Sequence, residues 1–263
     1  MASFLGMSKP IVAMVHFPAL PGSPLHDVAG GMAAIVDHAA RDIAALQKGG
    51  VDAVMFGNEG DRPYLLEAAP EAVAAFAAAV AELKPSLKVP FGVNYLWDPV
   101  ATVALAAATG ASFAREIFTG VYASDMGIWE PRCAAALRLR TALGKPEIQL
   151  LYNVNAEFAT SLDSRPIEVR AKSAVFSSLA DVICVSGPMT GEGVEVSDLA
   201  RVKKTVDVPV LANTGVRIDT VAEILKHADG CVIGTHFKRD GDTWAPVDPD
   251  RVARFMDKVR TLR

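Results

Sequence analysis

The sequence predicts a single (β/α)8 barrel, the TIM-barrel fold, as one domain over residues 1–263. Eight short apolar runs alternate with eight helical patterns along the whole chain, as successive βα units require. The length of 263 residues fits the roughly 250 residues that such a barrel takes. No G-x-G-x-x-G motif follows an apolar run, so the main alternative, a dinucleotide-binding Rossmann sheet, is disfavoured.

The expected strands are short runs rich in apolar residues, and many follow Gly or Pro. In chain order they are residues 10–16, 52–57, 90–95, 112–118, 148–154, 181–186, 209–213 and 230–234. The helical patterns between them are residues 31–48, 70–83, 99–108, 131–143, 167–179, 196–205, 220–227 and 249–262. Acidic helix-start signals are found at Asp98, Glu130, Asp219 and Asp248.

Composition disfavours several classes of protein. A formal charge of −4 with scattered Lys and Arg residues offers no basic stripe for nucleic acid. The three cysteines, Cys133, Cys184 and Cys231, form no C-x-x-C pair, which argues against disulfides and structural zinc and for a reducing, cytoplasmic location. No signal peptide is recognised and no apolar run approaches the roughly 20 residues that span a bilayer, so we expect no membrane insertion.

Two Gly-containing segments follow the last two expected strands, NTGVR (213–217) and GTHFK (234–238). The loops after strands seven and eight of a barrel often bind phosphate at its C-terminal face. Backbone amides, hydroxyls and one ammonium group are therefore predicted to bind a phosphorylated ligand at Thr214, Gly215, Gly234, Thr235 and Lys238. Arg217 is an alternative source of positive charge. Gly is also common in the turns that end ordinary strands. A phosphate-binding role is favoured only because both loops, after strands seven and eight, have this composition.

The fourth and fifth expected strands end in charged and amide side chains. Arg115 and Glu116 lie inside an apolar run, where burial is costly unless the charge is paired or used. Because side chains alternate along a strand, one of the two should face the barrel mouth and the other the helices. Asn153, Asn155 and Glu157 should share one face of the fifth strand and form a polar row toward the mouth.

These positions suggest roles in general acid–base chemistry. The candidate catalytic residues are Glu116, Glu157 and His16, although a lone His at a strand end is as often structural. The candidate substrate-binding residues, which would orient hydroxyls or an oxyanion, are Asn94, Arg115, Asn153, Asn155, Ser186 and Asn213. The acidic loop around Glu59 is interpreted as solvated. It could join the catalytic residues around Mg²⁺, but no tight ligand motif requires a metal, so we expect no obligatory cofactor.

Several blocks of this sequence resemble the BtpA/SgcQ family of TIM-barrel proteins. They are AMVHFPALPGSP, GGVDAVMFGNEGD, PFGVNYLWDP, FTGVYASDMG, ICVSGPMTGEG, ANTGVR and GTHFKRDGDTWAPVDPDRVARFM. The resemblance implies a barrel of the ribulose-phosphate-binding type, with its anion site at Gly215 and Gly234. One branch of that family is named for photosystem I biogenesis, and another accompanies sugar uptake and metabolism. Many members have ADVHVKHA on the fifth strand, where this chain has Asn153, Asn155 and Glu157.

The sequence thus predicts an enzyme that acts on a phosphorylated sugar or related phosphate ester, as an isomerase, epimerase or lyase. Two alternatives stay open. A carboxylate pair would also serve hydrolysis of a glycosidic or N-glycosidic bond. A non-catalytic biogenesis, assembly or regulatory factor could keep the same site as a ligand sensor. The Ala-rich helix expected at 70–83 is the candidate contact of a homo-oligomer.

Overall fold

The computed structural model describes residues 3–263 and confirms the predicted barrel. Its eight strands are β1 (Ile11–His16), β2 (Ala53–Gly57), β3 (Phe91–Asn94), β4 (Phe113–Glu116), β7 (Gln149–Asn153), β9 (Val182–Val185), β10 (Val210–Ala212) and β11 (Gly230–Ile233). They are all parallel and close in the order β1-β11-β10-β9-β7-β4-β3-β2. Each lies within its predicted range, because strands covered on both faces are continuous apolar runs in the sequence.

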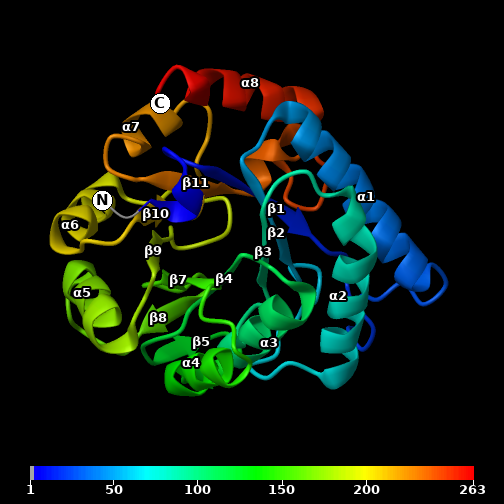
Figure 1. Cartoon of the computed structure of the whole chain (residues 1–263), viewed down its shortest axis with the longest axis horizontal. Coiled ribbons are helices and arrows are strands. Elements are labelled where there is room, and N and C mark those ends of the chain that lie inside the picture. The colour runs from blue at the N-terminus through cyan, green and yellow to red at the C-terminus, as the bar shows by residue number, and fades with distance from the viewer. Residues whose placement is uncertain (1–2) are drawn as a thin grey trace.

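Helices form the outer ring around these strands (Figure 1). They are α1 (Gly31–Gly49), α2 (Pro70–Leu83), α3 (Pro99–Thr109), α4 (Cys133–Ala142), α5 (Ile167–Ser178), α6 (Val196–Thr205), α7 (Val221–Ile224) and α8 (Pro249–Arg260). α8 packs beside α1, which joins the end of the ring to its beginning. Within residues 3–263, no helix has the length and apolar character needed to cross a bilayer.

Two details of the predicted helices are wrong. The helix expected at 220–227 is one turn, α7, because the next amides bond carbonyls three residues back, Lys226 to Glu223 and His227 to Ile224. Asp98 and Asp248 cap α3 and α8, each accepting two amides of the first turn. Glu130 and Asp219 do not cap helices. The N-cap positions of α4 and α7 are occupied by Arg132 and Thr220, and neither side chain forms a capping hydrogen bond.

Side-chain alternation along the strands separates two hydrophobic layers. Ala13 and Val15 of β1 belong to the layer between strands and helices, whereas Val12 and Met14 belong to the barrel interior. The short 3-10 helix η1 (Phe4–Gly6) adds Phe4 to the interior, where its ring meets Phe113 edge-on at 5.2 Å between centroids. Phe113 is the first residue of β4, so Phe4 closes the amino-terminal end of the barrel and leaves the opposite end for ligands.

A three-stranded antiparallel sheet covers part of that opposite end and was not predicted. It consists of β5 (Tyr122–Ser124), β6 (Gly127–Trp129) and β8 (Ala159–Ser161), from the segments that follow β4 and β7. Beneath it lies a small core in which Trp97 and Trp129 pack edge to face, with centroids 4.9 Å apart. The turn between β5 and β6, with Gly127 at a φ of +106°, is the one local signal of this hairpin.

Lys238, predicted to bind phosphate, instead forms a buried ion pair with Asp42 of α1. Its Nζ lies 2.6 Å from Asp42 Oδ2, and the side chains are 1% and 2% exposed. The other carboxylate oxygen of Asp42 accepts the Val247 amide at 2.8 Å. The 3-10 helix η3 (Thr235–Phe237) separates Lys238 from the end of β11. The side chain of Lys238 therefore contacts α1 in the ring of helices and does not point into the barrel mouth. The pair therefore fastens the segment after β11 to α1.

Replacing Lys238 by Met is expected to lower the free energy of unfolding by about 3–5 kcal/mol, because it leaves the Asp42 carboxylate buried without a cation. Urea unfolding measures the loss. Lys226→Met, which removes an exposed partner of Glu223, serves as control and should change it by less than about 0.5 kcal/mol. The double variant Lys238→Met with Asp42→Asn should recover part of the loss. A single-variant loss as small as the control's would contradict this role.

Candidate active site at the barrel mouth

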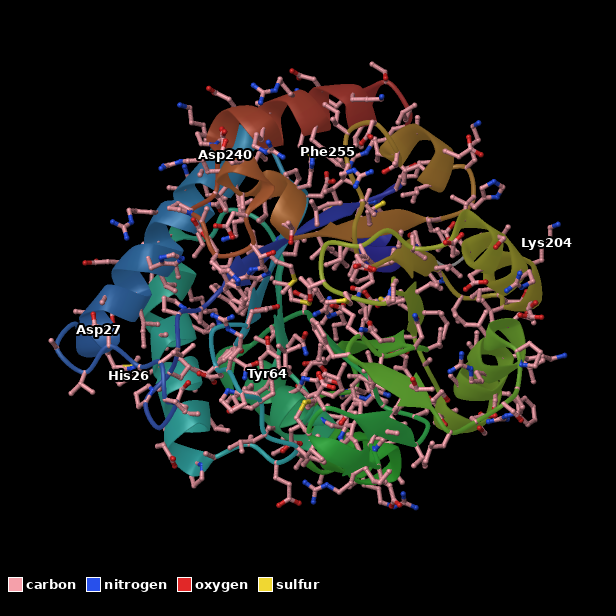
Figure 2. The ribbon with its side chains drawn as sticks, turned by 180° about the vertical axis from the view of Figure 1, so that it is seen from behind. His26, Asp27, Tyr64, Lys204, Asp240 and Phe255 are labelled. Carbon is pink, nitrogen blue, oxygen red and sulfur yellow. The ribbon has the colours of Figure 1, made fainter. Side chains whose placement is uncertain are left out.

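A cavity of about 250 Å³ opens where the strands end. The carboxyl end of every barrel strand contributes to its wall, in ring order through His16, Thr235, Thr214, Thr190, Asn153, Arg115, Asn94 and Glu59. Met14 and Val232, from the barrel interior, line it as well. Tyr64, another lining residue, lies inside the ring of helices in Figure 2, whereas Lys204 stands at its outer edge. The cavity therefore occupies the position where barrel enzymes place their active sites.

Eleven of the fourteen predicted site residues line this cavity: His16, Asn94, Arg115, Glu116, Asn153, Glu157, Asn213, Thr214, Gly215, Gly234 and Thr235. Three do not. Lys238 lies in the ion pair with Asp42. Asn155 bonds the backbone of Ser186 twice, donating to its carbonyl at 2.6 Å and accepting from its amide at 2.9 Å. Ser186 Oγ in turn accepts Asn213 Nδ2 at 2.8 Å, so both residues support a lining residue from behind.

Arg115 lies at the centre of the polar network. Its Nε donates to Asn94 Oδ1 at 3.1 Å, its Nη2 donates to the same oxygen, and its Nη1 donates to Asn213 Oδ1 at 2.6 Å. The residue is 7% exposed. Within residues 3–263 no ion pair joins it to a carboxylate. A buried guanidinium is thus held by neutral amide oxygens.

Glu116 also lines the cavity, so the expectation that one of the pair would face the helices is wrong. Glu116 is the last residue of β4, and donors from three neighbouring residues hold its carboxylate. Oε1 accepts Asn94 Nδ2 at 3.0 Å and the Trp97 amide at 2.8 Å, and Oε2 accepts the Ile117 amide. Strand alternation does not govern this last position, because three donors on neighbouring segments hold the carboxylate at the mouth.

Glu59 was interpreted as part of a solvated loop, and the structure corrects this. The side chains of Asn58, Glu59 and Asp61 are all buried. The loop is fastened on both sides: Asp61 Oδ1 accepts the Leu20 amide at 2.6 Å, and Asn58 Oδ1 accepts the Leu96 amide at 2.7 Å. The available signal was Gly60, whose Cβ position would lie 2.5 Å from the Ala19 nitrogen, since only Gly permits such close packing of two loops.

Burial shifts the pKa values of the acidic and imidazole groups in this cavity. It raises the pKa of Glu59 to about 7 against the opposing field of Arg115, and that of Glu116 to about 7 against its backbone donors. It also raises the pKa of Glu157, which Thr190 and Arg115 counteract. The pKa of His16 is lowered well below its ordinary value by burial, then by Lys238 and Arg115. The site thus combines a neutral imidazole with two carboxyls, Glu59 and Glu116, whose pKa values lie near 7, in the range that general acid–base catalysis uses.

Four buried polar atoms of residues that line this cavity find no hydrogen-bond partner among residues 3–263. They are His16 Nδ1, Glu59 Oε2, Trp97 Nε1 and Asn153 Oδ1. His16 Nε2 and Glu59 Oε1 face each other at 3.6 Å, beyond ordinary hydrogen-bond length. A buried unpaired donor or acceptor costs about 1–3 kcal/mol, and such atoms are few in native proteins. Four of them around one cavity indicate groups that a ligand satisfies.

The predicted phosphate loops lie side by side on one wall. Gly215 has a φ of +61°, and a Cβ there would lie 2.2 Å from the Glu192 carbonyl carbon, so this Gly lets the 187–193 loop pack against it. A Cβ on Gly234 would lie 3.2 Å from the His16 ring. The positive groups on this wall are Arg217 and Arg251 rather than Lys238. Sequence reasoning missed Arg251, whose signal was its place in the first turn of α8, directly after the strand-eight loop.

A metal centre is not built into these side chains. Among residues 3–263 no group of three or more His, Cys, Asp or Glu side chains is arranged to hold a metal ion. Although His16, Glu59, Glu116 and Glu157 all line the cavity, Asn94 and backbone amides already occupy the oxygens of Glu116.

Comparisons with known proteins agree with this architecture. A family model described as the BtpA family matches residues 7–261. The putative sgc region protein SgcQ of Escherichia coli (strain K12) is 48% identical over 260 residues, 98% of this chain and 97% of SgcQ. The photosystem I biogenesis protein BtpA of Synechocystis sp. is 29% identical over 255 residues, 95% of this chain and 88% of that protein. Both relatives match this chain over nearly its whole length.

Solved structures of low sequence identity share the fold. (S)-3-O-geranylgeranylglyceryl phosphate synthase from Thermoplasma acidophilum, in complex with its substrate sn-glycerol-1-phosphate, aligns with 99% of this chain and 100% of its own. The TM-score is 0.60 and the sequence identity is 15%. That likeness establishes the barrel, and the chemistry at the mouth has to be derived from the residues of this chain.

Glu59→Gln is expected to stabilise the protein increasingly as pH rises. Since the folded pKa of Glu59 is about 7 and its ordinary value is 4.5, the buried carboxyl resists ionisation between these values. As the pH rises, the free energy of unfolding of the wild-type protein therefore falls, by about 3 kcal/mol once the pH exceeds 7, whereas that of the Gln variant does not. Urea unfolding at pH 4.5, 6 and 8 measures the difference. The exposed Glu147→Gln control should show none, and a pH-independent difference for Glu59→Gln would refute the burial argument.

Proposed function

Since this chain belongs to the BtpA family and has buried carboxyls at its barrel mouth, we propose that it is an enzyme that transfers a proton on a phosphorylated sugar or related phosphate ester. The class covers isomerase, epimerase and lyase chemistry. The observation that supports it most directly is the set of four unpartnered polar atoms around one cavity. A ligand with several hydroxyl or carbonyl oxygens would satisfy all four.

The proton-transfer groups of this proposal are the carboxyls that keep an oxygen free. Glu59 has Oε2 unpartnered and a pKa of about 7, so it serves as the general base at neutral pH. Glu157, which accepts one bond from Thr190, serves as the partner acid, since burial raises its pKa. His16 stays neutral and bonds a substrate oxygen. Glu116, held by three donors, positions Asn94 instead of exchanging protons.

The phosphate of the substrate is assigned to the wall formed by the loops after β10 and β11. Thr235 offers its hydroxyl, and the guanidinium groups of Arg217 and Arg251 supply positive charge. Arg251 Nε donates to the His236 carbonyl at 2.8 Å, which fixes that side chain beside the loop. Guanidinium forks suit phosphate oxygens in charge and in geometry. In this assignment the phosphate lies beside Gly234, where an added Cβ would lie 3.2 Å from the His16 ring.

Solvent exchange tests the enzymatic reading. The protein is incubated in D₂O with a panel of aldose, ketose and sugar-acid phosphates, and proton NMR follows loss of the signal of the carbon-bound hydrogen next to the carbonyl or carboxyl group. We expect exchange or conversion of one substrate class, slowed about 10²- to 10⁴-fold in Glu59→Gln, as for loss of a general base.

The exposed Glu147→Gln is the matched control and should exchange at the wild-type rate. If a phosphate ester binds, as shown by a thermal shift, but no member of the panel exchanges or is converted, the site is a ligand sensor and the enzyme reading fails. Such a result would favour the non-catalytic class, to which the name of the Synechocystis relative, a photosystem I biogenesis protein, also points.

A further inference from the structure

We infer that the substrate has a second anionic group, a carboxylate bound by Arg115, so that its class is a phosphorylated sugar acid and not a neutral sugar phosphate. The inference rests on the proposed function and specifies its substrate. It comes from the charge and the hydrogen bonds of one buried side chain, which the phosphate wall does not use.

The charge of Arg115 lacks a counterion in contact. The side chain is 7% exposed, lines the cavity, and forms no ion pair with a carboxylate of residues 3–263. Its three bonds go to the amide oxygens of Asn94 and Asn213, which are neutral. A guanidinium cannot lose its proton at ordinary pH, and buried charges in proteins are normally paired. The missing partner is therefore expected in the ligand.

The hydrogen-bond count gives the shape of that partner. A guanidinium has five N–H groups, and the Nε–H, one Nη1–H and one Nη2–H are used here. One N–H remains on each terminal nitrogen. Donors on both terminal nitrogens can bind the two oxygens of one carboxylate, the bidentate arrangement in which Arg binds carboxylates.

The guanidinium is also held in one orientation before any ligand arrives. Asn94 donates its Nδ2 to Glu116 at 3.0 Å, which turns its Oδ1 toward Arg115. Asn213 donates its Nδ2 to Ser186 Oγ at 2.8 Å, with the same effect, and Asn155 fixes the backbone of Ser186. A rigid donor fork costs less entropy on binding than a flexible one. This explains why polar side chains behind the cavity are arranged around Arg115.

The two positive centres lie on different segments, and this separates the two anionic groups. Arg115 projects from β4, whereas Arg217 and Arg251 belong to the loop after β10 and to α8. The carboxyl groups that feel the field of Arg115 are Glu59, Glu116 and Glu157, and burial raises the pKa of each, which disfavours the ionised forms that could balance its charge. A ligand carboxylate, which is ionised at neutral pH, completes the charge balance.

Matched ligands test the inference. Calorimetric titration compares 6-phosphogluconate with glucitol 6-phosphate, and 3-phosphoglycerate with glycerol 3-phosphate; the members of each pair differ in a carboxylate against a CH₂OH group. For the wild-type protein we expect the acid of the pair that fits to bind at least tenfold more tightly. Arg115→Gln should bring that ratio near 1, whereas Arg217→Gln should weaken both members by a similar factor and leave the ratio unchanged.

The outcomes separate the two proposals. If the wild-type protein binds the alcohol phosphates as tightly as the acids, the carboxylate assignment is wrong while the sugar-phosphate function stands. If it binds neither member of either pair, nor any phosphate ester of the exchange panel, both proposals fail. The comparison of acid with alcohol in the wild-type protein needs no variant. Equal binding of the two by the wild-type protein therefore refutes the inference even if circular dichroism shows that Arg115→Gln fails to fold.

Discussion

The arrangement of the mouth depends on the fixation of Arg115 between Asn94 and Asn213. Asn94 is the last residue of β3, Arg115 lies on β4 and Asn213 follows β10, which is separated from β4 in the ring by β7 and β9. One side chain therefore links opposite walls of the barrel. The support continues through Ser186 to Asn155 at the ends of β9 and β7. The bonds of Arg115, Asn94 and Asn213 are buried, so they are stronger than exposed ones and each needs its partner, and the five strand ends are linked as one polar network.

The loops above this unit create the environment in which Glu59 is buried. The Tyr64 hydroxyl bonds the Glu59 carbonyl at 3.1 Å, and Asn58 links the same loop to Leu96 after β3. On the outer side, Arg62 lies 3.7 Å above the ring of Trp244, a cation–π contact between the loops after β2 and β11. These contacts exclude water from the carboxyl while leaving one of its oxygens facing the cavity. The raised pKa of Glu59 is thus a consequence of loop packing.

The sequence predicted the barrel well because its strands are covered on both faces, and it predicted strand-end residues such as Arg115 and Asn94 because a polar group in an apolar run has to be used. It failed where a residue's environment comes from distant segments. Lys238 looked free beside a Gly loop, but its partner Asp42 lies 196 positions away. Glu59 looked solvated, since nothing in its own loop shows that Leu20 and Leu96 fasten that loop. Glu116 sits where strand alternation ends and donors from neighbouring segments decide direction.

Glu59 and Glu116 show why a shifted pKa alone does not assign a catalytic role. Both carboxyls line the same cavity, and burial raises the pKa of each to about 7. Their hydrogen bonds differ: the oxygens of Glu116 accept three donors, while Glu59 Oε2 has no partner in the described part of the chain, residues 3–263. A proton that reaches Glu116 competes with the donors that hold Asn94 and the backbone, whereas Oε2 of Glu59 has its hydrogen-bonding capacity unused. Free hydrogen-bonding capacity, taken together with burial, is therefore the ground on which Glu59 is proposed to exchange protons and Glu116 to hold the site in place.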